Sequence, residues 1–297
     1  PVFLDYSYNF AVRNFRHGSF GNITKIDNTR QVKNSESFFS VAAGMPLAHR
    51  GVFLIRANGG HVNYRYDSDE LFADDTDHSR YSFFGIKAEL ARNTLDKFLY
   101  PRRGSDLKLS GIFVTGRDKY EPFDAEKFLS RTSRQWVGAR LTWDKYFDMP
   151  GCSWFSLGLN VDGVITNHPE FTTEGATVMS MPAYEPVPHA QMIYMPDFRG
   201  KRFAAGGVMP TFDLMPNFFL RTGFYAMFRE KRSFVPGVSG PVEDKRWHYI
   251  AEASLVYHTP IGPVSLALTK YDLRNWKNMY LTFNFGYAIF APKGTFY

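Results

Sequence analysis

The chain has 297 residues, of which 17% are aromatic, and a formal net charge of +6. No run approaches the roughly 18 consecutive apolar residues of a transmembrane helix, which excludes a helical membrane protein. Lys and Arg are dispersed rather than gathered in a motif, so nucleic acid is not an expected partner, and the single Cys152 excludes an intrachain disulfide.

Twelve segments have the composition and the flanking turn residues of β-strands. In chain order they are 3–15, 38–47, 52–66, 83–91, 106–115, 134–146, 153–166, 202–212, 218–229, 247–258, 263–270 and 279–290. No long segment has a helical period. The sequence therefore predicts an all-β chain of about twelve visible strands.

The last segment, 279–290, shows the strand pattern most strictly. Its large apolar residues are Met279, Leu281, Phe283, Phe285, Tyr287 and Ile289, with smaller or polar residues between most of them. Such alternation specifies a strand with one apolar and one polar face. Aromatic residues on the apolar face point to lipid, and an inward Asp162 or Arg221 is tolerable in a wet lumen. We therefore predict a transmembrane antiparallel β-barrel.

Connections between the predicted strands fall into two classes. Those at 149–152, 214–217 and 260–263 are short, whereas 67–80 and 166–198 are long and polar. Short turns at one end and long loops at the other are typical of outer-membrane barrels. The first strand begins almost at residue 1, with neither an initiator Met nor a signal region, so we expect a fragment or a processed product.

Two motifs resemble those of the Omp85 superfamily. The turn containing Asp96, Tyr100, Pro101 and Gly104 resembles its "D…YPTRG" hairpin, and Phe198-Arg199-Gly200 resembles its "VRGF" motif in a loop folded into the barrel. Their order also matches: hairpin, two strands, long loop, then five strands. The resemblance implies an Omp85-type barrel with sixteen strands, of which residues 1–297 would hold about twelve and lack the first strands. A complete, smaller barrel is the alternative.

Other segments resemble barrels at the C-terminal end of Bacteroidetes patatin-like phospholipases. They are 183–189, 202–207, 251–256 and 274–276. This resemblance implies an integral outer-membrane anchor, with a conduit as a further role, for an N-terminal hydrolase region with a Ser-Asp dyad that acts on phospholipids. The chain itself has no G-x-S-x-G elbow: 17–21 lacks the first Gly, and Asp162-Gly163 lies inside an alternating strand. No catalytic residue and no cofactor is predicted within it.

Two other functions stay open at this point. A BamA/TamA-type factor would assemble other outer-membrane proteins, and a passive porin would need no inward loop. Either way, the expected partners are outer-membrane lipids and lipopolysaccharide, whose phosphates suit a basic chain. The sequence leaves the oligomeric state undecided.

Arg199 is the residue of greatest interest, because the superfamily's matching Arg pins the inward loop to acidic groups on the barrel wall. Here Pro210 stands about where the usual Glu would fall, which leaves Asp213 or Glu252 as candidate partners. The acidic segment 67–77 suits a solvated loop better than a Ca²⁺ site, because it lacks EF-hand spacing. His61, His78 and His189 are scattered, so no metal site is predicted.

Overall fold

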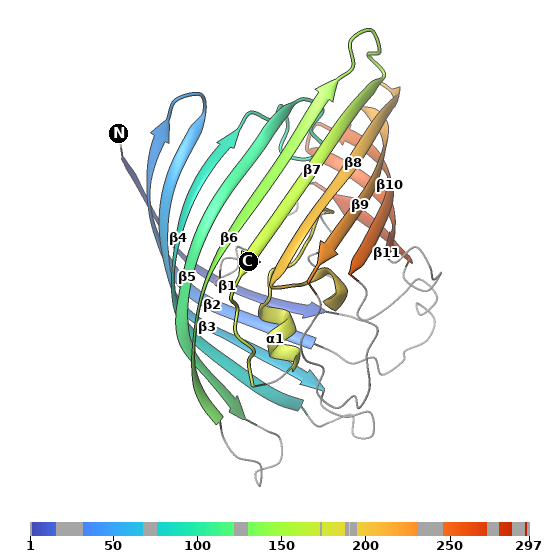
Figure 1. Cartoon of the computed structure of the whole chain (residues 1–297). Coiled ribbons are helices and arrows are strands. Elements are labelled where there is room, and N and C mark those ends of the chain that lie inside the picture. Colours follow the sequence, from blue (N-terminus) through green and yellow to red (C-terminus); the bar gives the residue numbers. More distant parts are fainter. Residues whose placement is uncertain are drawn as a thin grey trace.

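The computed structural model describes residues 2–15, 32–67, 76–121, 130–172, 174–187, 190, 195–230, 246–271, 279–286 and 295. These contain one antiparallel sheet of twelve strands, in which each strand pairs with the next in chain order (Figure 1). The strands are β1 Phe3–Phe15, β2 Val32–Leu47, β3 Gly51–Asp67, β4 Thr76–Asn93, β5 Gly104–Glu121, β6 Ser130–Asp148, β7 Phe155–Thr166, β8 Arg202–Met215, β9 Phe218–Arg229, β10 Trp247–Thr259, β11 Gly262–Tyr271 and β12 Met279–Phe285.

All twelve predicted strands are present, and the all-β prediction is confirmed. Several strands are longer than predicted: β4 begins seven residues before the predicted start at 83 and β5 ends six residues after the predicted end at 115. The extra residues carry polar and charged side chains on the outward face, so apolar alternation does not reveal them. The last strand is shorter than predicted, because it ends at Phe285, and residues 287–294 lie outside the described part.

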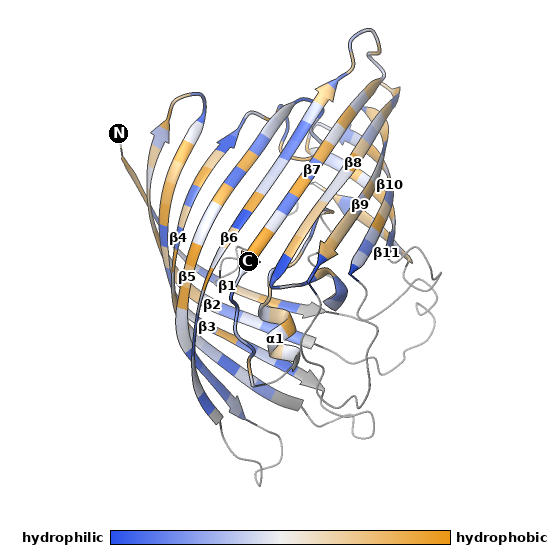
Figure 2. Ribbon diagram, viewed as in Figure 1, coloured by the Kyte–Doolittle hydropathy of each residue, from blue (hydrophilic) through white to orange (hydrophobic). Residues whose placement is uncertain are grey.

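Hydrophobic and hydrophilic residues alternate along the strands (Figure 2), and this alternation places successive side chains on opposite faces of the sheet. On β4, Phe84, Ile86 and Leu90 are 42–48% exposed, whereas Tyr81 and Phe83, at the alternate positions, are buried. Figure 1 shows the sheet curling around an interior that holds α1 (Glu174–Ser180). The apolar rows therefore face outward, and the buried residues face the interior.

The two ends of the curled sheet differ in their connections. The short turns 48–50, 94–103, 149–154, 216–217 and 260–261 share one end, which we call the short-turn end. The remaining connections, including 167–201 between β7 and β8, share the other, the long-connection end. This is the predicted arrangement, and it follows because every neighbouring pair of strands is antiparallel.

The sheet has two edge strands among the strands described. β1 pairs with β2, and β12 pairs with β11, but the sheet order does not join β1 to β12. No helix in the described part of the chain is long and apolar enough to cross a membrane.

Candidate functional site

The connection between β7 and β8 folds into the interior of the sheet and is the candidate site. Its described residues, 167–172, 174–187, 190 and 195–201, contain α1 and a 3₁₀ turn at Pro196–Phe198. We call this segment the internal loop. The sequence predicted a long loop here, and α1, with only seven residues, is too short to show a helical period.

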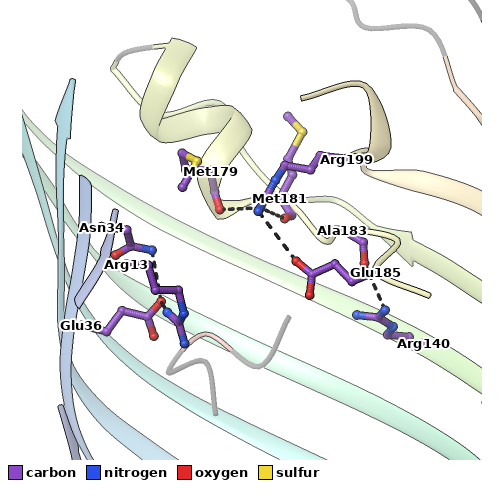
Figure 3. Close-up of polar contacts among 9 residues, drawn as sticks. All are labelled: Arg13, Asn34, Glu36, Arg140, Met179, Met181, Ala183, Glu185 and Arg199. Carbon is purple, nitrogen blue, oxygen red and sulfur yellow. Dashed lines mark hydrogen bonds and ion pairs between the residues drawn. The ribbon is translucent and has the colours of Figure 1, made fainter. Parts of the chain in front are cut away.

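Arg199 holds the internal loop together from within (Figure 3). Its side chain is 4% exposed, and Nη1 donates hydrogen bonds to the carbonyl oxygens of Met179 and Met181, at 3.0 and 3.3 Å. Nη2 lies 3.9 Å from Oε1 of Glu185, a second loop residue. The guanidinium therefore joins the end of α1 to the chain that follows it.

The acidic candidates for Arg199 have other contacts. Asp213 accepts a hydrogen bond from Arg102, and Glu252 accepts hydrogen bonds from Ser254 and Thr269 at 3.0 and 3.1 Å. The sequence left Asp213 and Glu252 open as candidates, and the contacts of Arg199 are with Met179, Met181 and Glu185 instead. The carboxylate nearest Arg199 comes instead from its own loop, fourteen residues earlier in the chain.

Backbone pairing adds a second support inside the loop. Tyr184 N donates to Phe198 O at 2.9 Å, and Gly200 N donates to Pro182 O at 3.1 Å. An antiparallel bridge joins Ala183 to Arg199. These bonds fix the segment around Arg199 as a short internal hairpin.

A buried carboxylate of β5 anchors the start of the loop to the wall. Asp118 is fully buried and accepts hydrogen bonds from Ser79 Oγ, Thr172 N and Thr172 Oγ1, at 2.9, 3.0 and 3.0 Å. Beside it, the ring of Phe171 stands edge-on to that of Tyr81, with centroids 5.1 Å apart. Hydrogen bonds and aromatic contacts therefore act together at this point.

His168 packs into the same aromatic group. Its ring centroid lies 4.6 Å from that of Trp136 and 5.5 Å from that of Phe171, and the side chain is 1% exposed. Burial lowers the pKa of His168 to about 3, because a charged imidazole would lose its hydration there. The ring is neutral at physiological pH.

Charged groups on β6 and β7 hold the middle of the loop. Arg140 donates to both carboxylate oxygens of Asp162, at 3.1 and 2.6 Å, and also to the carbonyl oxygen of Ala183 at 3.1 Å (Figure 3 includes the last bond). Tyr184 OH donates to Asn160 Oδ1 at 2.7 Å. Burial raises the pKa of Tyr184 well above its usual value, so this hydroxyl keeps its proton.

On the opposite wall, formed by β9 to β11, the ring of Phe198 packs against aromatic side chains. Its ring stands edge-on to those of His248 on β10 and Tyr271 on β11, with centroids 5.6 and 5.9 Å apart. Arg229 of β9 donates to His248 Nε2 at 3.1 Å and lies 3.8 Å from the carboxylate of Asp197. The internal loop thus contacts both walls of the curled sheet.

The β4–β5 turn, with the motif at 96–104, folds inward at the short-turn end. Asp96 Oδ1 accepts from the backbone N of Arg102 and Arg103, at 3.0 and 3.3 Å. Gly104 has φ +104°, and a Cβ there would lie 2.3 Å from Thr94 O, so this position requires glycine. Pro101 is buried within the turn.

Tyr100 connects the β4–β5 turn to the opposite wall of the curled sheet. Its OH donates to Ser265 Oγ of β11 at 2.8 Å, and its ring lies 6.1 Å from that of Phe219. The Arg221 guanidinium lies 5.6 Å from the Tyr100 ring and 5.5 Å from the Tyr146 ring. The turn and the internal loop therefore occupy the two ends of the interior.

Sequence reasoning missed the wall residues that receive the loop. Asp118 and Arg140 could have been found, because each is a charged residue at an inward position of an alternating strand. Among the described residues there is no group of three or more His, Cys, Asp or Glu that could hold a metal ion. Residues 17–21, and the acidic segment between 67 and 77 except its strand ends, lie outside the described part.

Comparison with known proteins supports the fold. No protein-family model matches the chain, and neither does any curated protein sequence. Among solved structures, the chain is similar to BamA from Haemophilus ducreyi lacking POTRA domains 1–3, with a TM-score of 0.57 and 12% identity over 95% of this chain. The match spans 57% of that BamA structure. The beta domain of the Bordetella autotransporter BrkA has a TM-score of 0.36 and 10% identity, over 94% of each chain.

Proposed function

We propose that this chain is an integral β-barrel of the bacterial outer membrane that serves as the anchor of a patatin-like phospholipase. The observation that carries the anchor role is the occupied interior, in which the internal loop and the β4–β5 turn bridge opposite walls. A barrel filled in this way suits attachment to a membrane better than free diffusion of solutes. A passive porin is accordingly disfavoured.

The outward side chains support the membrane location. On β1 the outward residues include Tyr6, Tyr8 and Phe10, which are 66–79% exposed, and the other strands repeat this apolar row. Exposed apolar surface of this extent is costly in water and favourable in lipid. Polar and charged residues such as Asp162 point inward, as they do in membrane barrels.

The phospholipase part of the proposal rests on sequence resemblance. The segments resembling patatin-like phospholipase barrels lie in the internal loop, in β8 and β10, and before β12. A hydrolase region with a Ser-Asp dyad would belong to the same polypeptide and would cleave acyl esters of phospholipids. The barrel would hold that region at the membrane that supplies its substrate.

The edges of β1 and β12, unpaired in the described part of the chain, support two further proposals: that additional strands close the barrel, and that the chain is an assembly factor. Unpaired strand edges are costly in hydrocarbon, so additional strands, sixteen in all as in Omp85 barrels, would join β1 to β12. A seam between such edges is also what a BamA/TamA-type assembly factor would use. The fold likeness to BamA is the observation that favours this alternative.

The two functions are separated by one experiment on the native protein. Membranes from the source cells are fractionated, the protein is captured with antibodies against this barrel, and hydrolysis of labelled phospholipids is measured. Ester cleavage that a serine-reactive fluorophosphonate blocks supports the anchor role. Absence of cleavage, combined with loss of other outer-membrane barrels when the protein is depleted, would establish the assembly role instead.

A further inference from the structure

A group of cations lies on the outward face of β2 to β6, toward the long-connection end. Its members are Lys33, Arg65, Arg80, Arg117, Lys119 and Arg131, and we call them the cation patch. Five are exposed and Lys119 is half-buried, whereas the neighbouring positions Tyr64, Tyr81 and Asp118 are buried in the interior. Because side chains alternate along a strand, the six cations share the outer face.

The strand register brings these cations close together. Arg80 on β4 lies directly opposite Lys119 on β5, and Lys119 lies opposite Arg131 on β6. Lys33 on β2 lies opposite Arg65 on β3. Like charges directly opposite each other destabilise a sheet. The arrangement is therefore unfavourable unless an anion binds to it.

Carboxylates of the sheet do little to neutralise the patch. On this outward face, the described side chains of β2 to β6 at the long-connection end include one carboxylate, Glu121, which is paired with Lys119. The opposite wall differs, because Arg202 on β8 lies 3.6 Å from Glu230. Among the described outward side chains of β2 to β6, the patch therefore keeps most of its positive charge.

On β4 and β5, the cations lie a similar distance beyond the apolar band. On β4, Arg80 lies four residues before the outward Phe84, with Ser82 between them. On β5, Arg117 likewise follows Phe113 by four residues. Four residues of strand span about 13 Å. If the apolar band is buried in hydrocarbon, the cations lie among the lipid headgroups.

We infer that the cation patch binds the phosphate groups of a phosphorylated glycolipid in the outer leaflet. This inference rests on the proposed outer-membrane location, which places the long-connection end on the cell's outer side. Four interstrand spacings give the patch a width of about 19 Å, enough for more than one phosphate. Arg, which supplies four of the six cations, pairs bidentately with phosphate.

The test measures binding of phosphorylated lipid A to the full chain folded in zwitterionic micelles. The triple variant Arg80→Gln/Lys119→Gln/Arg131→Gln removes the central row of cations. At about fivefold per cation near a membrane surface, we expect roughly 100-fold weaker binding. A control with Arg50→Gln, Lys97→Gln and Arg103→Gln removes the same charge from the short-turn end and is expected to change the affinity by about twofold at most, since these sites lie many screening lengths away.

Lipid A stripped of its phosphates, and phosphatidylglycerol, serve as comparison ligands. Three results would each overturn the assignment. The first is that the wild-type chain binds the stripped glycolipid as tightly as phosphorylated lipid A, and the second is that the two triple variants lose the same affinity for lipid A. The third is that the patch variant loses as much affinity for phosphatidylglycerol as for lipid A. Insertion of every variant into bilayer vesicles is measured in parallel. If the wild-type chain and the patch variant both insert and bind lipid A equally well, this inference alone is refuted. If the wild-type chain fails to insert, the proposed location is refuted as well.

Discussion

Replacement of Arg199 by methionine tests how the internal loop is held. The side chain is 4% exposed and donates two hydrogen bonds, at 3.0 and 3.3 Å, to carbonyl oxygens of the loop. A hydrogen bond from a charged donor contributes about 1.5–3 kcal/mol, so two contribute about 3–6 kcal/mol. Breaking a buried ion pair such as Arg199–Glu185 by removing one partner costs about 3–5 kcal/mol. We therefore expect the docked loop to lose about 3–5 kcal/mol.

Amide hydrogen exchange of the folded chain in micelles measures this loss directly. A loss of that size corresponds to exchange that is roughly two to four orders of magnitude faster in residues 176–187, since each 1.4 kcal/mol is about tenfold. Exchange in β4 and β5 is expected to change far less, because their ladder bonds do not involve Arg199.

The matched control is Lys201→Met in the same segment. Lys201 forms an ion pair with Glu170 at 3.3 Å, but both side chains are substantially exposed. Exposed pairs contribute about 0–1 kcal/mol, so loop exchange would accelerate about fivefold at most. Similar exchange rates in the Arg199 and Lys201 variants would refute the reasoning.

Three further predictions concern the contacts at the ends of the interior. Asp118→Asn removes an acceptor for Thr172 while keeping the side chain's size, and exchange at 171–172 should accelerate about tenfold. Tyr100→Phe loses the bond to Ser265 and should lower the free energy of unfolding by about 1 kcal/mol in urea titrations, whereas Tyr100→Ala should also admit ions in conductance recordings. Burial keeps His168 neutral in the docked loop, whereas in the undocked loop it takes up a proton as pH falls below 6.5, so docking should weaken by about 3 kcal/mol at pH 4.5. His168→Phe should abolish that pH dependence in exchange measurements.

The strands could be predicted because each one has a pattern of residues that is visible within its own segment of the sequence. Period-2 alternation in 279–285 and Pro or Gly at the turn 260–262 specify a strand and its connection without reference to the rest of the chain. Strand ends were harder, because Arg80 and Arg117 interrupt the apolar alternation where the strands continue. The charge that obscured those ends is the feature from which the cation patch is inferred.

Contacts of the candidate site could not be predicted in the same way. Arg140 reaches the carbonyl oxygen of Ala183, 43 positions later, and Arg102 reaches Asp213, 111 positions later. Such contacts depend on how the sheet curls, and no local pattern encodes the curvature. The partner of Arg199 could not be identified from sequence for a related reason, because Glu185 becomes its neighbour only when 183–200 folds into an internal hairpin.

Planar-bilayer recordings of the full chain test the central claim, that this is a membrane barrel whose interior is occupied. We expect the wild-type protein to insert and to show no large constitutive conductance. The double variant Arg199→Met/Tyr100→Ala, which releases the loop and the turn, is expected to open a conducting pore. A wild-type protein with a large, steady pore that the double variant leaves unchanged would contradict the account.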